Sequence, residues 1–470
     1  MMIYFHIKLE SFRNMPVRRN YPKMDYSMEY KRKLLPVEEA MKVVKSGDLV
    51  QYGEFVMNSS YLDAALAQRV DELENVNIRT TTCPFPPKTV LADPGRKHFI
   101  YNDYHMSAAS RKLHDKDLCN YVPLTYHEGP SFYERDYVAA DVALIKVAPM
   151  DKHGFFNLGT ALSLTPLFCD TAKTVIVEVN ENVPICLGGC RESIHISEVD
   201  YIVEGDNQPM IQLPELPIAD TDKKIAAIVL EEIEDGACLQ LGIGAMPNAV
   251  GAMIAQSDLK DLGVHTEMLV DSFVDMYEAG RITGRRKQLD KCKMAYTFAM
   301  GTNKLYNFLD GNPACAIYPV DYTNDPFIIG RNDKVLGINN AIEVDLYGQV
   351  ASESSGTRHI SGTGGQLDFI IGSYYSKGGK GLICLTSTFT DKEGRLQSRI
   401  RPTLTPGAVV TVPRSINFYV VTEYGITMLK AKSTWQRAEA LINLAHPNLR
   451  DELIKEAEKM RIWVRSNKIV

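Results

Sequence analysis

Hydrophobic positions along the chain follow two periods, and each period predicts a different kind of element. Continuous apolar runs at residues 142–148 and 174–179 are typical of strands in a parallel sheet that is buried on both faces. A shorter strand is predicted at residues 49–52, after a helix at residues 38–44 and a turn at Gly47-Asp48. Because helices and strands alternate, the pattern indicates an α/β fold.

Three segments of the first half resemble three segments of the second half. In chain order, residues 46–53 match 235–242, residues 143–154 match 382–394, and residues 175–178 match 420–423. Each match is weak alone, but all three come in the same order in both halves. We therefore expect two similar α/β domains, the second of which carries an insertion.

The join between these domains is predicted in a proline-rich stretch. Residues 209–217 contain three prolines in nine positions and so exclude a helix. We therefore assign residues 28–215 to an N-terminal α/β domain and residues 216–470 to a C-terminal one. The chain closes with two predicted helices, at residues 435–445 and 450–461.

Composition and charge narrow the class of protein. Apolar residues make up 45% and charged residues 23% of the chain, as in a water-soluble globular protein. A net charge of −6 argues against nucleic-acid binding, because counterion release requires a basic face. No apolar run reaches the roughly 18 residues of a membrane span. Residues 1–27 lack the pattern of a secretory signal. We expect them to be a poorly ordered leader, with the true start at Met24 or Met28.

The cysteines point to a reducing compartment. There are nine, an odd number, and they are scattered along the chain. Cys186 and Cys190 form the only close pair, and no second pair stands at a metal-binding spacing. We therefore predict reduced thiols in a cytoplasmic protein without a metal site.

A Gly-x-Gly turn at Gly242 and Gly244 follows a predicted strand and opens a predicted helix that contains Met246 and Asn248. Such a turn directs backbone N–H groups and the positive end of the helix toward a ligand. A dinucleotide-binding fingerprint would need a third glycine where Pro247 stands, so the motif does not predict an NAD site. A tight turn without a ligand is the alternative.

Glu267 is a candidate for chemistry because of its place in the predicted sheet. Residues 263–269 predict a strand, and apolar residues at helical spacing follow, with Asp271 as the expected N-cap. Glu267 therefore falls near the C-terminal end of a strand, where open α/β sheets bind ligands. Spacing alone favours the alternative, a glutamate in a salt bridge or a helix cap.

A run rich in small residues at positions 355–365 ends in Gly364 and Gly365 and continues directly into an apolar segment. Glycines let bare backbone N–H groups approach a ligand oxygen. A glutamate that faces such a donor is what acyl transfer through a carboxylate nucleophile requires. The alternative is a flexible surface loop.

Four collinear motifs resemble those of the acetyl-CoA hydrolase/transferase family, most closely its butyrate and 4-hydroxybutyrate CoA-transferases. They are residues 242–250, 265–268, 361–369 and 421–425. The resemblance implies two CoA-transferase-type α/β domains with mostly parallel sheets and an active site in the cleft between them. It also implies a nucleophile, Glu267, with oxyanion-binding N–H groups from Met246, Gly364 and Gly365. The residues that it implies for substrate or CoA binding are Gly242, Gly244, Asn248, Gln366 and Glu423.

The resemblance further implies transfer of CoA between a short-chain acyl-CoA, butyryl- or 4-hydroxybutyryl-CoA, and acetate. The reaction would be ping-pong, through a glutamyl-CoA thioester, with coenzyme A as a substrate and no other cofactor. Homodimers or higher homo-oligomers are expected. Two alternatives stay open: a short-chain acyl-CoA (acetyl-CoA) hydrolase that uses the same residues, and a non-catalytic acyl-CoA-binding protein. The preferred acid and the direction of flux are not predicted.

Overall fold

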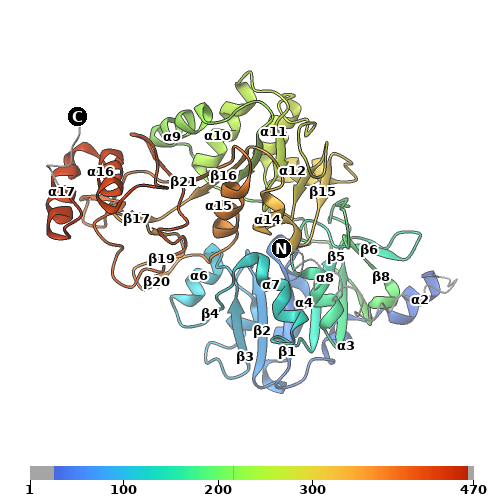
Figure 1. Cartoon of the computed structure of the whole chain (residues 1–470). Coiled ribbons are helices and arrows are strands. Elements are labelled where there is room, and N and C mark those ends of the chain that lie inside the picture. The colour runs from blue at the N-terminus through green and yellow to red at the C-terminus, as the bar shows by residue number, and fades with distance from the viewer. Residues whose placement is uncertain (1–25, 215, 464–470) are drawn as a thin grey trace.

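The computed structural model describes residues 26–214 and 216–463 (Figure 1). The expected leader falls mostly on residues 1–25, which lie outside the described residues, whereas Tyr26 and Ser27 open helix α2. Within the described ranges, no helix is both long enough and apolar enough to cross a membrane.

The first half forms a seven-stranded sheet in the order β4-β3-β2-β1-β5-β7-β9. Every neighbouring pair is parallel. Its strands are β1 (Leu49–Glu54), β2 (Val76–Thr81), β3 (Phe99–Asp103), β4 (Asn120–Tyr121), β5 (Val142–Val147), β7 (Thr174–Val179) and β9 (Tyr201–Glu204). Its helices are α2 (Tyr26–Lys33), α3 (Val37–Met41), α4 (Ser60–Ala67), α5 (Lys88–Ala92), α6 (Ala108–His114), α7 (Gly129–Glu134) and α8 (Thr165–Thr171). Single 3₁₀ turns are η1 (Phe55–Met57), η2 (Val70–Glu72), η3 (Tyr126–Glu128) and η4 (Ile196–Glu198).

The second half forms an eight-stranded sheet in the order β15-β13-β11-β10-β16-β21-β25-β26. It is parallel except for the last pair, β25 and β26. Its strands are β10 (Cys238–Leu241), β11 (Gly263–His265), β13 (Met294–Tyr296), β15 (Cys315–Ile317), β16 (Val335–Asn340), β21 (Lys380–Cys384), β25 (Tyr419–Thr422) and β26 (Gly425–Met428). Its helices are α9 (Asp220–Glu231), α10 (Ala245–Gln256), α11 (Asp271–Glu278), α12 (Asn303–Leu309), α13 (Val320–Thr323), α14 (Pro326–Ile329), α15 (Gln366–Tyr375), α16 (Thr434–Leu444) and α17 (Arg450–Lys459), with η5 (Pro447–Leu449).

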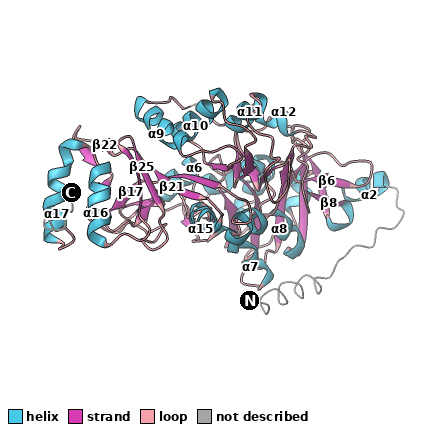
Figure 2. Ribbon diagram, turned by 45° about the horizontal axis from the view of Figure 1, so that its top comes forward, coloured by secondary structure: helices cyan, strands magenta, loops and turns pink. Residues whose placement is uncertain are grey.

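Small ladders complete the structure. They are β6 (Phe155–Asn157) with β8 (Ser193–His195), β12 (Met268–Leu269) with β14 (Phe298–Ala299), β17 (Glu343–Asp345) with β18 (Val350–Ala351) and β24 (Ile400–Arg401), β19 (Ser354–Ser355) with β20 (Arg358–His359), and β22 (Thr388–Thr390) with β23 (Leu396–Ser398). Figure 2 shows β17, β22, α16 and α17 gathered at the end of the molecule farthest from β6 and β8.

The expectation of an α/β fold with mostly parallel sheets is confirmed. Within the apolar run at 142–148, residues 142–147 form β5, and all six residues of this strand are buried. The predicted helix at 38–44 is shorter in the structure, because α3 ends at Met41 and the chain turns through residues 42–43. The described residues of 209–217 form no helix. The domain limits drawn there stay a prediction.

The collinear repeat corresponds to similar strand positions in the two sheets. β1 and β10 both lie inside their sheets, each with strands on both sides. The second sheet holds β16 between β10 and β21, whereas β5 lies directly beside β1 in the first. The second half thus carries an additional strand, in line with the expected insertion.

The two halves pack directly on each other through apolar side chains. The largest cluster of buried apolar residues draws from both sheets. Within it, the ring of Phe55, which follows β1, stacks on the ring of Phe298 in β14 with centroids 3.6 Å apart. Since β14 pairs with β12, this contact brings the end of β1 close to the segment that contains Glu267.

Candidate active site

Glu267 lies where one predicted strand is broken into two. The expected strand at 263–269 is β11 followed by β12, with Thr266 and Glu267 between them. The backbone N–H groups of Thr297 and Phe298 both donate to the carbonyl of Glu267, at 3.0 and 3.2 Å. These bonds fix the backbone at the break, so Glu267 follows the C-terminal end of β11, as expected.

The expected N-cap is wrong by one residue. Val270 caps α11, and Asp271 is the first residue of the helix. The carboxylate of Asp271 instead accepts the backbone N–H of Thr302 at 2.9 Å and the Thr302 hydroxyl at 2.7 Å. Asp271 therefore connects the start of α11 to the residue that precedes α12, a tertiary contact that helical spacing does not reveal.

The Gly-Gly loop packs between the two halves and is not a surface linker. The N–H of Met106 donates to the carbonyl of Ser361 at 3.3 Å, and the N–H of Thr363 donates to the Tyr121 hydroxyl at 3.2 Å. Gly364 has a φ of +52°, a conformation that glycine adopts at little cost. The backbone of the loop is thus held against the first half by the backbone of Met106 and the side chain of Tyr121.

Gly365 directly faces the Glu267 carboxylate. Its backbone N–H donates to that carboxylate. A β-carbon at Gly365 would collide with Oε2 of Glu267 and with Nδ2 of Asn324. A β-carbon at Gly364 would lie 3.8 Å from Oε1 of Glu267 and 3.5 Å from the His105 ring. The two glycines therefore line the space around the carboxylate.

Asn324, between α13 and α14, supplies a second donor. Its Nδ2 donates to Oε2 of Glu267 at 2.7 Å and lies 3.4 Å from Oδ2 of Asp368, in the first turn of α15. The residue before it is fixed in turn, because Nε2 of His265 donates to the carbonyl of Thr323 at 2.8 Å. The His-Thr-Glu motif therefore supplies both Glu267 and a support for its donor.

The surroundings shift the acidity of Glu267. The residue is partly exposed, but its carboxyl group is enclosed enough for burial to be the largest influence. Burial and the charge of Asp368 raise the pKa, while the hydrogen bonds from Asn324 and Gly365 lower it. The net result is a pKa of about 7, so the group gains and loses its proton close to neutral pH.

The Gly-x-Gly turn follows β10, the parallel neighbour of β11, so it lies at the same edge of the second sheet as Glu267. The hydroxyl of Thr266 lies 3.5 Å from the carbonyl of Leu241, which directly precedes Gly242. Gly244 has a φ of +126° and precedes α10. Met246 is in the first turn of that helix, where backbone N–H groups have no partner within the helix.

Three of the residues implied for CoA binding lie near the C-terminal ends of β10 and β16. The N–H of Asn248 donates to the carbonyl of Gly244 at 3.1 Å. Nε2 of Gln366 donates to the carbonyl of Asn340 at 2.6 Å. A β-carbon at Gly244 would lie 3.5 Å from Nδ2 of the same asparagine. Gly244 and Gln366 thus flank Asn340, at the end of β16.

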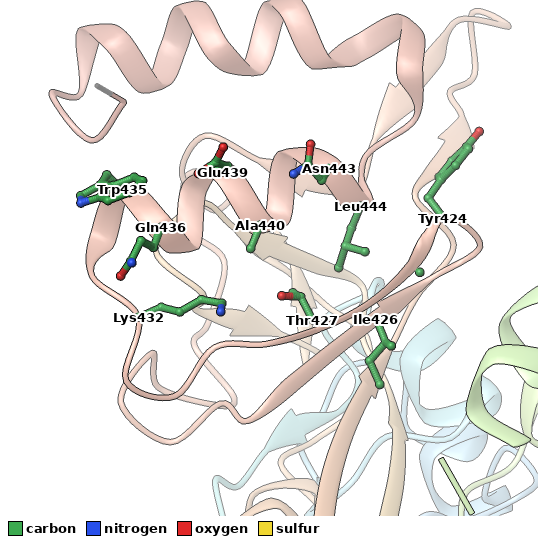
Figure 3. A pocket seen from close by; sticks show the side chains of 11 residues that line it. Tyr424, Ile426, Thr427, Lys432, Trp435, Gln436, Glu439, Ala440, Asn443 and Leu444 are labelled. Carbon is green, nitrogen blue, oxygen red and sulfur yellow. The ribbon is translucent and has the colours of Figure 1, made fainter. Parts of the chain in front are cut away.

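Glu423 forms its side-chain hydrogen bonds away from Glu267. Its carboxylate accepts the N–H and the hydroxyl of Ser387, at 2.8 and 2.6 Å, and in the described residues it shares no hydrogen bond with Glu267. The next residue lines a cavity of about 640 Å³ between β26 and α16 (Figure 3). The lining residues are Tyr424, Gly425, Ile426, Thr427, Lys432, Trp435, Gln436, Glu439, Ala440, Asn443 and Leu444. Neither Glu267 nor any of its direct partners lines this cavity.

The described residues hold no group of three or more His, Cys, Asp or Glu arranged to bind a metal. The nine cysteines are unpaired, and seven are buried.

Comparisons with known proteins place this site in a family. The chain matches the acetyl-CoA hydrolase/transferase N-terminal domain at residues 18–214 and the C-terminal domain at residues 301–457. It is 53% identical over 446 residues to a butyryl-CoA:acetate CoA-transferase of Anaerostipes caccae, which is 95% of this chain and 100% of that protein. It is 39% identical over 436 residues to a 4-hydroxybutyrate coenzyme A transferase of Clostridium kluyveri, 93% and 100% of the two chains.

Among solved structures, RipA from Yersinia pestis superposes with a TM-score of 0.85 at 36% identity, over 93% of this chain and 100% of that one. The chain therefore belongs to the acetyl-CoA hydrolase/transferase family. The resemblance inferred from the four motifs is confirmed.

Sequence reasoning did not single out Asn324, although it donates to the candidate nucleophile. It stands 57 residues after Glu267, outside every motif. Asp368 lay within the motif at 361–369, but its carboxylate was assigned no role. A role for the Asp368 carboxylate is indicated only by its contacts with Asn324 and with His127 of the first half.

Proposed function

We propose that the protein is an acyl-CoA:carboxylate CoA-transferase. It would move CoA between a short-chain acyl-CoA, butyryl- or 4-hydroxybutyryl-CoA, and acetate. The observation that supports this best is the environment of Glu267. A carboxylate with a pKa of about 7 accepts hydrogen bonds from the Gly365 backbone N–H and the Asn324 side chain, at the end of a parallel strand. The relatives named for these reactions cover nearly the whole chain.

The proposed chemistry runs through Glu267. Its carboxylate attacks the thioester carbonyl, which expels CoA thiolate and leaves an acyl-glutamyl anhydride. The thiolate then attacks the glutamyl carbonyl of the anhydride, which releases the first carboxylate and forms a glutamyl-CoA thioester. A second carboxylate, such as acetate, reverses these two steps and leaves as acyl-CoA. The thioester is conserved throughout, so only coenzyme A and carboxylates take part.

Backbone donors would stabilise the oxyanions of these steps. Gly365 N–H holds the Glu267 carboxylate, and after attack it would bind the oxyanion that develops beside the same atoms. Gly364 and Met246 are the other donors that we propose. Removing one such donor costs roughly 3 kcal/mol in known cases. Gly242, Gly244, Asn248 and Gln366 would bind CoA, and Glu423 would act from farther away.

The acyl group is proposed to be short and unbranched, with about four carbons. One methylene in an apolar pocket discriminates by only ~1–3 kcal/mol, so neighbouring chain lengths should also react. Competition between butyrate, 4-hydroxybutyrate, propionate and succinate as acceptors tests this. A clear preference for succinate would overturn the monocarboxylate proposal, since a second buried carboxylate needs a paired cation.

One assay separates transfer from hydrolysis. Butyryl-CoA and acetate are mixed with the protein, acetyl-CoA is measured, and free thiol is followed in parallel. Transfer predicts acetyl-CoA formation without thiol release. Thiol release that does not depend on acetate would instead show an acyl-CoA hydrolase. The absence of any reaction would favour a non-catalytic acyl-CoA-binding protein. Borohydride should inactivate the enzyme only after acyl-CoA has been added.

The remaining expectations also stay proposals. The protein is proposed to act in the cytoplasm as a homodimer or higher homo-oligomer, without nucleic-acid or membrane partners. Light scattering coupled to size-exclusion chromatography measures the oligomer directly. A monomeric mass in active preparations would contradict it.

A further inference from the structure

A second residue pair connects the first half of the molecule to the candidate nucleophile. His127 lies in η3 of the first half, and Asp368 lies in the first turn of α15 in the second. Nδ1 of His127 is 2.7 Å from Oδ1 of Asp368, and the backbone N–H of His127 donates to Oδ2 at 3.2 Å. Asp368 is fully buried, whereas the His127 side chain is 27% exposed. These two contacts with His127 fix the orientation of the Asp368 carboxylate, whose Oδ2 lies near Asn324.

Asp368 decides how the carboxamide of Asn324 is turned. Nδ2 of Asn324 reaches a carboxylate oxygen of Glu267 and one of Asp368. The buried Oδ1 has no hydrogen-bond partner in the described residues, so nothing holds the group from its other side. Turned by 180°, Oδ1 would face two acceptor oxygens. The second carboxylate therefore favours the orientation that presents N–H to Glu267.

The charge of Asp368 also affects the protonation of Glu267. The charge of Asp368 raises the pKa of Glu267, against the effect of Asn324. The groups that face His127 are Asp368, Glu128 and Asp325. Tyr126, next to His127, also faces Glu267, and its pKa is far above the ordinary value, so it stays neutral. Burial raises the pKa of Asp368 itself, while the hydrogen bonds from His127 and Asn324 lower it. The charge that Asp368 carries when ionised is the one whose removal should be felt at Glu267.

Resting on the proposed transfer reaction, we infer that His127 and Asp368 are positioning residues for the nucleophile. His127 holds Asp368 in place across the contact between the halves. Asp368 orients the Asn324 carboxamide, and Asn324 directs the Glu267 carboxylate at the substrate. Neither member of the pair touches the reacting atoms in this scheme.

Two substitutions of Asp368 separate orientation from charge. Asp368→Leu keeps the number of side-chain heavy atoms and the branching but leaves Asn324 without its second acceptor. It should lower kcat/KM by roughly tenfold to hundredfold, the range found when the hydrogen-bond partners that support metal-binding residues are removed. Asp368→Asn keeps an oxygen for Asn324 and removes the charge. It should retain more activity, and the acidic limb of its kcat/KM profile should move to lower pH.

His127→Leu tests the other end of the pair on a partly exposed side chain, which makes loss of folding less of a concern. It should lower kcat/KM by about tenfold, and His127→Asn should restore part of the loss, because its amide can donate near the position of Nδ1. Asp115→Asn is the matched control. Asp115 and Arg358 form another ion pair between the halves, at 2.6 and 3.0 Å, with no contact to Asn324. This control should leave the kcat/KM profile unchanged.

Borohydride trapping of the wild-type protein with butyryl-CoA keeps the two proposals apart. If wild type forms no trapped glutamyl-CoA adduct, the proposed reaction itself fails. If wild type forms the adduct and Asp368→Leu and His127→Leu keep kcat/KM within twofold, only the positioning role is overturned. An acidic limb that stays in place in Asp368→Asn also overturns it. Equal losses in Asp115→Asn would reduce the pair to a general contact between the halves, against the inference.

Discussion

Nδ2 of Asn324 donates a hydrogen bond of 2.7 Å to Oε2 of Glu267, and the two residues are 57 positions apart in the chain. A donor at this distance favours the charged form of a carboxylate and restricts its rotation. It opposes burial, which is the largest of the influences that raise the pKa of Glu267. The Asn324 side chain thus influences both the orientation and the ionisation of the proposed nucleophile, Glu267.

Asn324→Ala should remove this donor and lower kcat/KM by roughly tenfold to hundredfold, because a hydrogen bond to a charged group contributes ~1.5–3 kcal/mol. Asn324→Asp should be worse, since a second carboxylate beside Glu267 raises its pKa further. Transfer from butyryl-CoA to acetate measures both. Equal activity of Asn324→Asp and wild type would show that the contact is unimportant for turnover.

Glu267→Gln should abolish transfer and borohydride-dependent inactivation while the fold is retained, because an amide is not a nucleophile for the thioester. Circular dichroism checks the fold, and mass spectrometry excludes deamidation back to glutamate. Near-normal turnover in a folded, non-deamidated sample would falsify the assignment of Glu267 as the covalent nucleophile.

Gly365→Val should reduce the rate by orders of magnitude, because its side chain would occupy the space of the Glu267 carboxylate and of Asn324 Nδ2. Gly95→Ala is a suitable control, because a β-carbon there has only contacts of 3.8 Å or longer and its φ lies outside the left-handed region. Steady-state kinetics and thermal unfolding of both variants measure the effect. Wild-type rates in Gly365→Val would return the loop to a structural role.

The pH dependence of kcat/KM for acyl-CoA should show an acidic limb near pH 7. The folded pKa of Glu267 is raised from its ordinary value of 4.5 to about 7, so lowering the pH through 7 protonates the nucleophile and activity falls. Because the pKa of Glu267 is higher in the folded state, its contribution to the free energy of unfolding is lost as the pH rises from about 4.5 to 7. An acidic limb near pH 4.5 would contradict the buried setting of this carboxylate.

Initial rates at varied butyryl-CoA and acetate should give parallel lines in double-reciprocal plots, because the glutamyl-CoA thioester forms before the acceptor binds. The thioester should also form with butyryl-CoA alone and be visible as an added mass on the peptide that contains Glu267. Intersecting lines would require both substrates to be bound together.

Much of the fold could be predicted from patterns within short segments. The apolar run at 174–179 is β7 residue for residue, and the predicted helix at 435–445 is α16, displaced by one residue at each end. Such strands can be predicted because a strand that is buried on both faces of a parallel sheet consists of a continuous apolar segment. The family and the candidate nucleophile followed likewise from the motifs around Glu267 and Gly364–Gly365.

Contacts between distant segments were decided only by the tertiary structure. The break between β11 and β12 depends on N–H groups of Thr297 and Phe298, and Asp271 pairs with Thr302 and caps no helix. The support of Glu267 by Asn324, and of Asn324 by Asp368, leaves no periodic or spacing signal. A hydrogen bond requires two groups within about 3.5 Å in space, and nothing in a chain's local pattern encodes that distance. The sequence by itself therefore determined which elements form and which residues could react, whereas packing of the two halves decided what surrounds them.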